Sequence, residues 1–112
     1  MIALRSAELF RLELHARMPF RYGIATMTDV PQLIARLTFE LDGTTETGIA
    51  ADLLPPKWFT KDPARALGAE IDEMLRVIRA AIACARTLRA KTPFAFWREL
   101  DEAQAAWAAT EK

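Results

Sequence analysis

The sequence is poor in the residues that mark several classes of protein. Cys84 is the single cysteine among 112 residues, so an internal disulfide is excluded. His15 is the single histidine and has no cysteine partner at ligand spacing, whereas zinc sites need several such ligands. No apolar run reaches the roughly 20 residues of a membrane-spanning helix, and the first ten residues contain no signal-peptide core. These absences predict a cytoplasmic protein with no metal site of its own and no membrane partner.

Charge of one sign is not in excess either. The chain has 15 basic and 15 acidic side chains, mixed along its length. Nucleic-acid-binding proteins normally carry a basic excess, so we expect no nucleic-acid partner. Two acidic pairs, at positions 72–73 and 101–102, are expected on solvated helix faces, because adjacent helical residues point in different directions. We expect His15 to be exposed on its strand and Cys84 to be an inert, packed thiol.

The first half of the chain has the alternation of β-strands. Residues 8–17 predict a strand whose buried face carries Phe10, Leu12, Leu14 and Ala16. Residues 33–41 alternate in the same way. Asp42-Gly43 follows them, a dipeptide that favours the positive φ angles of a tight hairpin turn. A third strand over residues 45–53 should pair antiparallel with the second, and the result is a three-stranded antiparallel meander.

The second half has the periodicity of helices. Asp62-Pro63 predicts a helix start, because an N-cap side chain precedes a proline whose missing N–H costs nothing there. The apolar stripe that follows consists of Leu67, Ile71, Met74, Leu75, Ile78, Ile82 and Ala85. Thr92-Pro93 repeats the start signal before a second helix, whose apolar face carries Phe96, Trp97, Leu100, Ala103 and Trp107. Strands followed by helices predict one α+β domain over residues 1–112, with a helical bundle packed on one face of the sheet.

Two connections are richer in large apolar side chains than their position requires. Residues 18–27 read MPFRYGIATM and are expected to form a long loop after the first strand. Residues 52–61 read DLLPPKWFTK, in which paired prolines stiffen a segment that ends in Trp58-Phe59. The aromatic side chains of these connections either fold back to fill a small core or form a contact site, since clustered exposed aromatics mark such sites.

In their order and spacing, these features resemble the N-terminal capping domain of the enolase superfamily, in the branch of mandelate racemase and muconate-lactonising enzyme. The strand that ends in Met18-Pro19-Phe20 is similar to the opening strand of that domain. The second strand, entered by Val30-Pro31 and followed by Asp42-Gly43, is similar to its hairpin. Residues 48–52 (GIAAD) and 54–58 (LPPKW) are similar to its third strand and the loop after it.

In that family, two mobile loops of the cap close over the active site of a (β/α)-barrel and select the substrate. The resemblance implies substrate contacts from Phe20, Arg21, Tyr22 and Gly23 in the first loop and from Leu54, Lys57 and Trp58 in the second. Arg21 or Lys57 would meet a distal anionic group of the substrate, and Tyr22 or Trp58 would form a wall of the pocket.

The resemblance also implies a reaction, the abstraction of a proton α to a carboxylate, with magnesium stabilising the enediolate. The family's catalytic bases and metal ligands lie in the barrel, which takes about 250 residues that this chain does not contain. We therefore expect a capping domain of a magnesium-dependent racemase, cycloisomerase or dehydratase. Its partners would be a C-terminal barrel in cis and a small carboxylate substrate, and the chain alone would not catalyse the reaction.

A different class of function remains open. The chain is alternatively a free-standing α+β protein-interaction domain with no catalytic activity, and the two aromatic connections are then its partner surface. In the capping interpretation, the surface that normally seats on the barrel is left bare, at the helical face or at the two connections. Large apolar patches mark association sites, so we expect a homo-oligomer.

Overall fold

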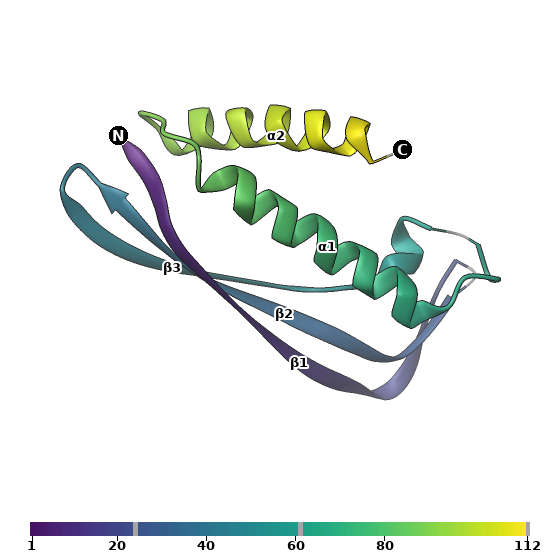
Figure 1. Cartoon of the computed structure of the whole chain (residues 1–112). Helices are drawn as coiled ribbons and strands as arrows, with labels where there is room; N and C mark the ends of the chain where they lie inside the picture. Colours follow the sequence, from purple (N-terminus) through teal and green to yellow (C-terminus); the bar gives the residue numbers. More distant parts are fainter. Residues whose placement is uncertain (24, 61, 112) are drawn as a thin grey trace.

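A computed structural model describes residues 1–23, 25–60 and 62–111 and consists of a curved sheet with two helices on one face (Figure 1). The elements in chain order are β1 (Ile2–Tyr22), β2 (Ala25–Leu41), β3 (Thr44–Leu53), the 3-10 turn η1 (Pro56–Trp58), α1 (Leu67–Ala85) and α2 (Pro93–Thr110). The sheet order is β1-β2-β3 and both pairings are antiparallel. The predicted α+β fold is confirmed. Ile24 and Lys61, which belong to the two predicted connections, lie outside the described residues.

The turn between β2 and β3 forms where the sequence predicts it. Asp42 has a φ of 47° and Gly43 a φ of 88°, and Leu41 pairs directly with Thr44. Positive φ angles at both central residues match the right-handed twist of the flanking strands. The N-terminal ammonium forms an ion pair with the Asp42 carboxylate, so the start of β1 is held beside this turn.

The predicted buried face of β1 is wrong. Phe10 pairs with Ile34, which lies on the opposite face of β2 from the core residue Leu33, and Phe10 is 45% exposed. The cause is a register irregularity between Leu4 and Ser6. An extra residue in one strand of an antiparallel pair turns every later side chain to the other face. Beyond it, Leu9 faces the helices, and Phe10, Leu12 and Leu14 lie on the uncovered face.

The long loop predicted for residues 18–27 is also wrong, because most of this segment is paired strand. β1 and β2 continue past the end of β3, whose last pair is Leu53 with Gln32, and form a two-stranded arm. Within the arm, Phe20 pairs with Met27 and Tyr22 with Ala25. The register is irregular between His15 and Phe20. Such extra residues bend a strand pair, and the arm curls upward at its end in Figure 1.

One of the two predicted helix starts is correct. Thr92 is the N-cap of α2, and its hydroxyl accepts a hydrogen bond from the Ala95 N–H at 3.0 Å. The start predicted at Asp62-Pro63 is wrong, since α1 begins at Leu67 after Ala66, which provides no side-chain cap. The Asp62 carboxylate instead accepts from the Ala64 N–H at 2.9 Å, and the Asp62 carbonyl accepts from the Arg65 N–H. Asp62 therefore stabilises a turn that precedes the helix.

The core lies between the helices and the inner face of β1 and β2. One buried cluster consists of Leu33, Leu54, Ile71 and Leu75, so α1 packs on the sheet through the stripe predicted from the sequence. The other consists of Leu4, Ala85, Ala90 and Phe96, at the junction of α1 and α2. Backbone hydrogen bonds in both directions between Ile2 and Ala90 tie this junction to the start of β1.

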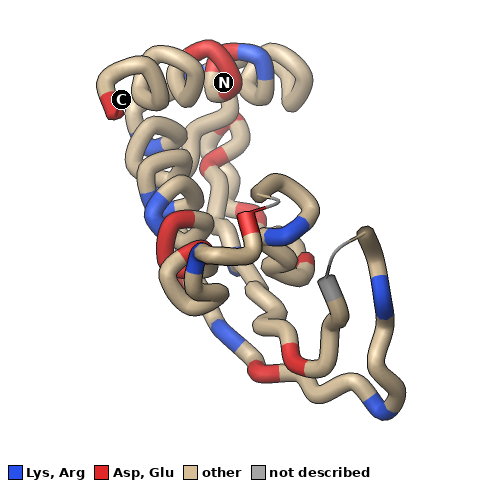
Figure 2. The backbone as a smooth tube through the Cα atoms, turned by 90° about the vertical axis from the view of Figure 1, so that its right-hand side faces the viewer, with Lys and Arg blue, Asp and Glu red and all other residues tan. Residues whose placement is uncertain are grey.

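Basic and acidic positions are both distributed along the length of the chain in Figure 2. The pairs at positions 72–73 and 101–102 are exposed, as predicted. His15 is exposed, and Cys84 is a partly buried free thiol. Within the described residues, no helix is long and apolar enough to cross a membrane.

Candidate functional site

The two segments singled out in the sequence meet at one end of the domain. The bent tip of the arm brings Tyr22 onto Trp58 of η1, with ring centroids 5.3 Å apart and planes inclined by 15°. The Phe20 ring also stacks with the Tyr22 ring, at a centroid distance of 6.0 Å. We call these three residues the aromatic stack. Because Phe20 is 55% and Trp58 59% exposed, the stack presents aromatic surface to solvent rather than filling the core.

A cleft of about 230 Å³ lies beside the aromatic stack. It is bounded by the arm, η1 and the start of α1, and its lining consists of Tyr22, Thr26, Met27, Asp29, Val30, Leu54, Pro55, Pro56, Lys57, Leu67 and Ile71. Complete ligand sites usually enclose about 300–1,000 Å³. This cleft is smaller than that range.

Lys57 lies in the lining of the cleft, but its ammonium is directed into the domain. It forms an ion pair with Glu70 of α1, and the two side chains are 14% and 1% exposed. It also donates to the Asp62 carbonyl at 2.8 Å and to the Arg65 carbonyl at 3.5 Å. The resemblance assigns Lys57 to substrate, whereas the geometry uses its charge to neutralise a buried carboxylate.

The other residues assigned by the resemblance fall into different environments. Leu54 is 4% exposed in the core cluster under α1 and contributes only its edge to the cleft. Gly23 has a φ of 55° and begins the turn at the tip of the arm, a conformation that glycine adopts without strain. Arg21 is exposed, and its register partner is Thr26. Because successive side chains of a strand point to opposite faces, Arg21 projects from the other face of the arm than Phe20 and Tyr22, and it is not part of the cleft lining.

Asp29 supplies a negative charge at the rim of the cleft. Its carboxylate is hydrogen bonded to Nδ1 of His15, its cross-strand partner, at 2.6 Å. This hydrogen bond, with help from Thr28, holds the pKa of the Asp29 carboxyl below its ordinary value. The carboxylate is thus kept ionised to a lower pH than an isolated surface aspartate.

Sequence reasoning missed Glu70, the most deeply buried charged residue described. The position of Glu70 in the sequence does indicate that it is buried. Glu70 is three residues after Leu67 and four before Met74, so it falls within the apolar stripe of α1 rather than on its polar face. A charged residue at such a position is almost never buried unless it is paired, which would have pointed to an internal cation such as Lys57.

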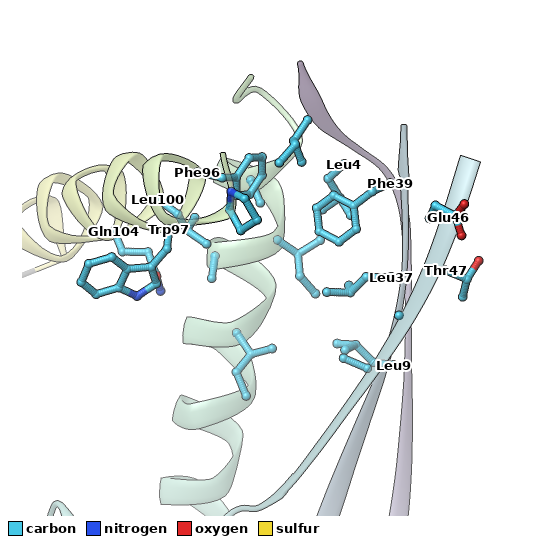
Figure 3. Close-up of a pocket in the computed structure, with 18 of the residues that line it drawn as sticks. Leu4, Leu9, Leu37, Phe39, Glu46, Thr47, Phe96, Trp97, Leu100 and Gln104 are labelled. Carbon is cyan, nitrogen blue, oxygen red and sulfur yellow. The ribbon is translucent and has the colours of Figure 1, made fainter. Parts of the chain in front are cut away.

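A second, larger hollow lies between the sheet and the two helices. This groove has a volume of about 610 Å³ and is almost entirely apolar. Figure 3 shows Leu37 and Phe39 of β2 on one wall and Trp97 and Leu100 of α2 on the other. Trp97, on the wall of the groove, is 56% exposed, and its ring lies 5.6 Å from that of Phe94.

Within residues 1–23, 25–60 and 62–111, no three histidine, cysteine, aspartate or glutamate side chains gather in a way that would hold a metal ion. Comparison with protein-family models, with curated proteins and with solved structures finds no match to this chain.

Proposed function

We propose that this chain is the substrate-capping domain of an enzyme of the enolase superfamily, with a barrel as its partner in cis. The observation that carries the proposal is the stack of Tyr22 on Trp58, which joins two segments distant in sequence at one end of the domain. The order of elements, three antiparallel strands and then helices, also supports it. The chemistry of the parent would be proton abstraction α to a carboxylate, in a cytoplasmic racemase, cycloisomerase or dehydratase.

In this role, the chain's own residues contact the substrate and exclude water from the active site. The exposed rings of Phe20 and Trp58 would cover an apolar part of the substrate. The resemblance assigns Arg21 to an anionic group remote from the reacting carbon, which it would reach around the edge of the arm, because its side chain alternates with those of Phe20 and Tyr22. Excluding water strengthens electrostatic interactions in the enclosed site. The magnesium implied by the resemblance does not fit the described residues here, because their carboxylates form no ligand set. No step through the metal is assigned to this chain.

The first experiment is to read the gene beyond the codon for Lys112. Continuation into a barrel, with a strand ending in Lys-x-Lys and acidic residues at the ends of later strands, is the expected result. In that longer protein, Arg21→Ala and Trp58→Ala should lower kcat/KM for the preferred carboxylate more than for its analogues, because cap contacts select substrate. Arg98→Ala, at an exposed position of α2, is the matched control. A stop codon after Lys112, or unchanged selectivity in both variants, would contradict the proposal.

The second candidate function is a protein-interaction domain without catalytic activity. The apolar groove favours it, because an apolar hollow with the exposed ring of Trp97 on its wall is typical of an association surface. The same gene sequence discriminates between the two candidates. If the reading frame ends at Lys112, the groove becomes the leading site.

A further inference from the structure

The Lys57–Glu70 ion pair is placed where it controls the position of Trp58. Lys57 is the central residue of η1, and Glu70 lies in the first turn of α1, where the helix dipole favours a carboxylate. A 3-10 turn has three residues per turn, so neighbouring side chains point roughly 120° apart. With Lys57 directed inward, Trp58 is directed outward, toward the arm that carries Tyr22.

The hydrogen-bonding capacity of Lys57 is fully used inside the domain. A lysine ammonium has three N–H donors and no acceptor. Its three acceptors here are Oε1 of Glu70, the carbonyl of Asp62 at 2.8 Å and the carbonyl of Arg65 at 3.5 Å. No donor is left for a substrate, so the contribution of Lys57 to the cleft comes through the backbone turn that it anchors.

Packing of η1 against α1 does not by itself require a charged pair. Desolvation of two buried ions offsets most of their attraction, and apolar side chains of similar volume are often as stabilising. The charged pair also fixes the orientation of η1 relative to α1, because only one orientation presents the Lys57 ammonium to Glu70 and to both carbonyls at once. Glu70 Oε2 has no hydrogen-bond partner in the described part of the chain, so Lys57 is the group that neutralises this carboxylate.

We propose that Lys57 and Glu70 are positioning residues, whose ion pair holds η1 in the orientation that stacks Trp58 on Tyr22. They act on the cleft through Trp58 and make no contact with a ligand themselves. This inference rests on the proposed function in one respect: the capping role identifies the aromatic stack's ligand as a substrate. The positioning needs no substrate and is measured on this chain alone.

The test uses Glu70→Gln, with Glu73→Gln as the matched control. Glu73 is on the same helix, but its carboxylate is exposed and bonds to Arg65. Two readouts report on Trp58: nuclear Overhauser effects between the Tyr22 and Trp58 rings, and acrylamide quenching in a Trp97→Phe/Trp107→Phe background. We expect Glu70→Gln to abolish the ring-to-ring effects and to increase quenching, because the ammonium then lacks its counter-ion and η1 is released. Glu73→Gln should change neither.

A second variant separates positioning from folding. Lys57→Met/Glu70→Leu replaces the pair by apolar side chains and removes the penalty of an unpaired buried ion. We expect this double variant to fold, as judged by circular dichroism, and still to lose the contacts between Tyr22 and Trp58. If either folded variant keeps these contacts and the wild-type quenching, the proposal is overturned. Absence of a barrel downstream of Lys112 would end the capping proposal and leave this result unaffected.

Discussion

The ring of Tyr22, at the tip of a long two-stranded arm, stacks on the ring of Trp58, in a short turn after the third strand, at a centroid distance of 5.3 Å. We expect the two side chains to be energetically coupled. Aromatic pairs contribute about 0.5–1.5 kcal/mol beyond the area they bury. A double-mutant cycle with Tyr22→Leu and Trp58→Leu, measured by urea denaturation, should give a coupling energy in that range.

The control for this cycle pairs Tyr22→Leu with Trp97→Leu. Trp97 lies on α2 in the wall of the apolar groove, and its ring contacts that of Phe94 in a tilted arrangement. The effects of distant mutations should add to within about 0.3–0.5 kcal/mol. A Tyr22–Trp58 coupling no larger than this control would mean that the stack contributes nothing to joining the arm to η1.

The buried position of Glu70 makes Lys57 the more sensitive member of the pair to single substitution. Lys57→Met leaves a carboxylate that is 1% exposed without a counter-ion. Breaking a buried pair in this way costs about 3–5 kcal/mol, whereas replacing both partners by apolar residues costs far less. We expect Lys57→Met to lower the free energy of unfolding by that amount in urea titrations, and Lys57→Met/Glu70→Leu to recover most of it. A double variant less stable than Lys57→Met would contradict this reading of the pair.

The parts of the fold that follow local rules could be predicted from the sequence. Asp42-Gly43 and Thr92-Pro93 each determine their own backbone geometry through neighbours a few residues away, and both predictions are confirmed. The stripe of α1 could be predicted because its period is regular. The concentration of aromatic residues around Tyr22 and Trp58 singled out two segments that the structure brings into contact.

The errors come from features that depend on distant partners. The irregularity after Leu4 exchanges the two faces of β1, and nothing in the alternation of residues 8–17 shows which face the helices cover. The sequence predicts a loop where the arm forms, because the strands of the arm are stabilised by pairing with each other and not by a buried face. The role of Lys57 depends on Glu70, which belongs to a different element. In a single sequence, the only sign of an ion pair between two elements is a charged residue within an apolar stripe, and this sign does not identify the partner.

The hydrogen bond between His15 and Asp29 predicts the pH behaviour of the cleft rim. The pKa of Asp29 is lowered in the folded chain, chiefly by this hydrogen bond. A lowered carboxyl pKa stabilises the fold at pH above the unfolded value, and the contribution is lost as pH falls through the folded value. His15→Ala should therefore raise the pKa of Asp29 toward that of a free aspartate, as followed by the chemical shift of its carboxyl carbon. An unchanged pKa in His15→Ala would assign the effect to another group.

The two Asp/Thr-Pro sequences provide a matched pair of capping substitutions. Thr92→Ala removes the hydroxyl that accepts from the Ala95 N–H and should lower the stability by about 1 kcal/mol. Asp62→Ala removes a carboxylate that bonds within a turn before α1 and leaves the helix start at Ala66 unaltered. We expect a smaller decrease in Tm for Asp62→Ala than for Thr92→Ala in thermal denaturation. The reverse order would mean that the turn at Asp62 contributes more to stability than the cap at Thr92.

The apolar groove predicts that the chain associates with itself. Trp97 combines a position on the groove wall with 56% exposure, so it should be buried when two copies meet through their helical faces. Self-association through one patch is commonly isologous, with each copy supplying the same residues. Trp97→Glu places a charge in that contact and should shift sedimentation-velocity profiles to the monomer.

Ile49→Glu is the control, since Ile49 is 71% exposed but pairs with Arg36 and so lies on the face of the sheet away from the helices. A wild-type chain that stays monomeric at high concentration would contradict the prediction. Loss of association in Ile49→Glu but not in Trp97→Glu would move the contact to the uncovered face of the sheet.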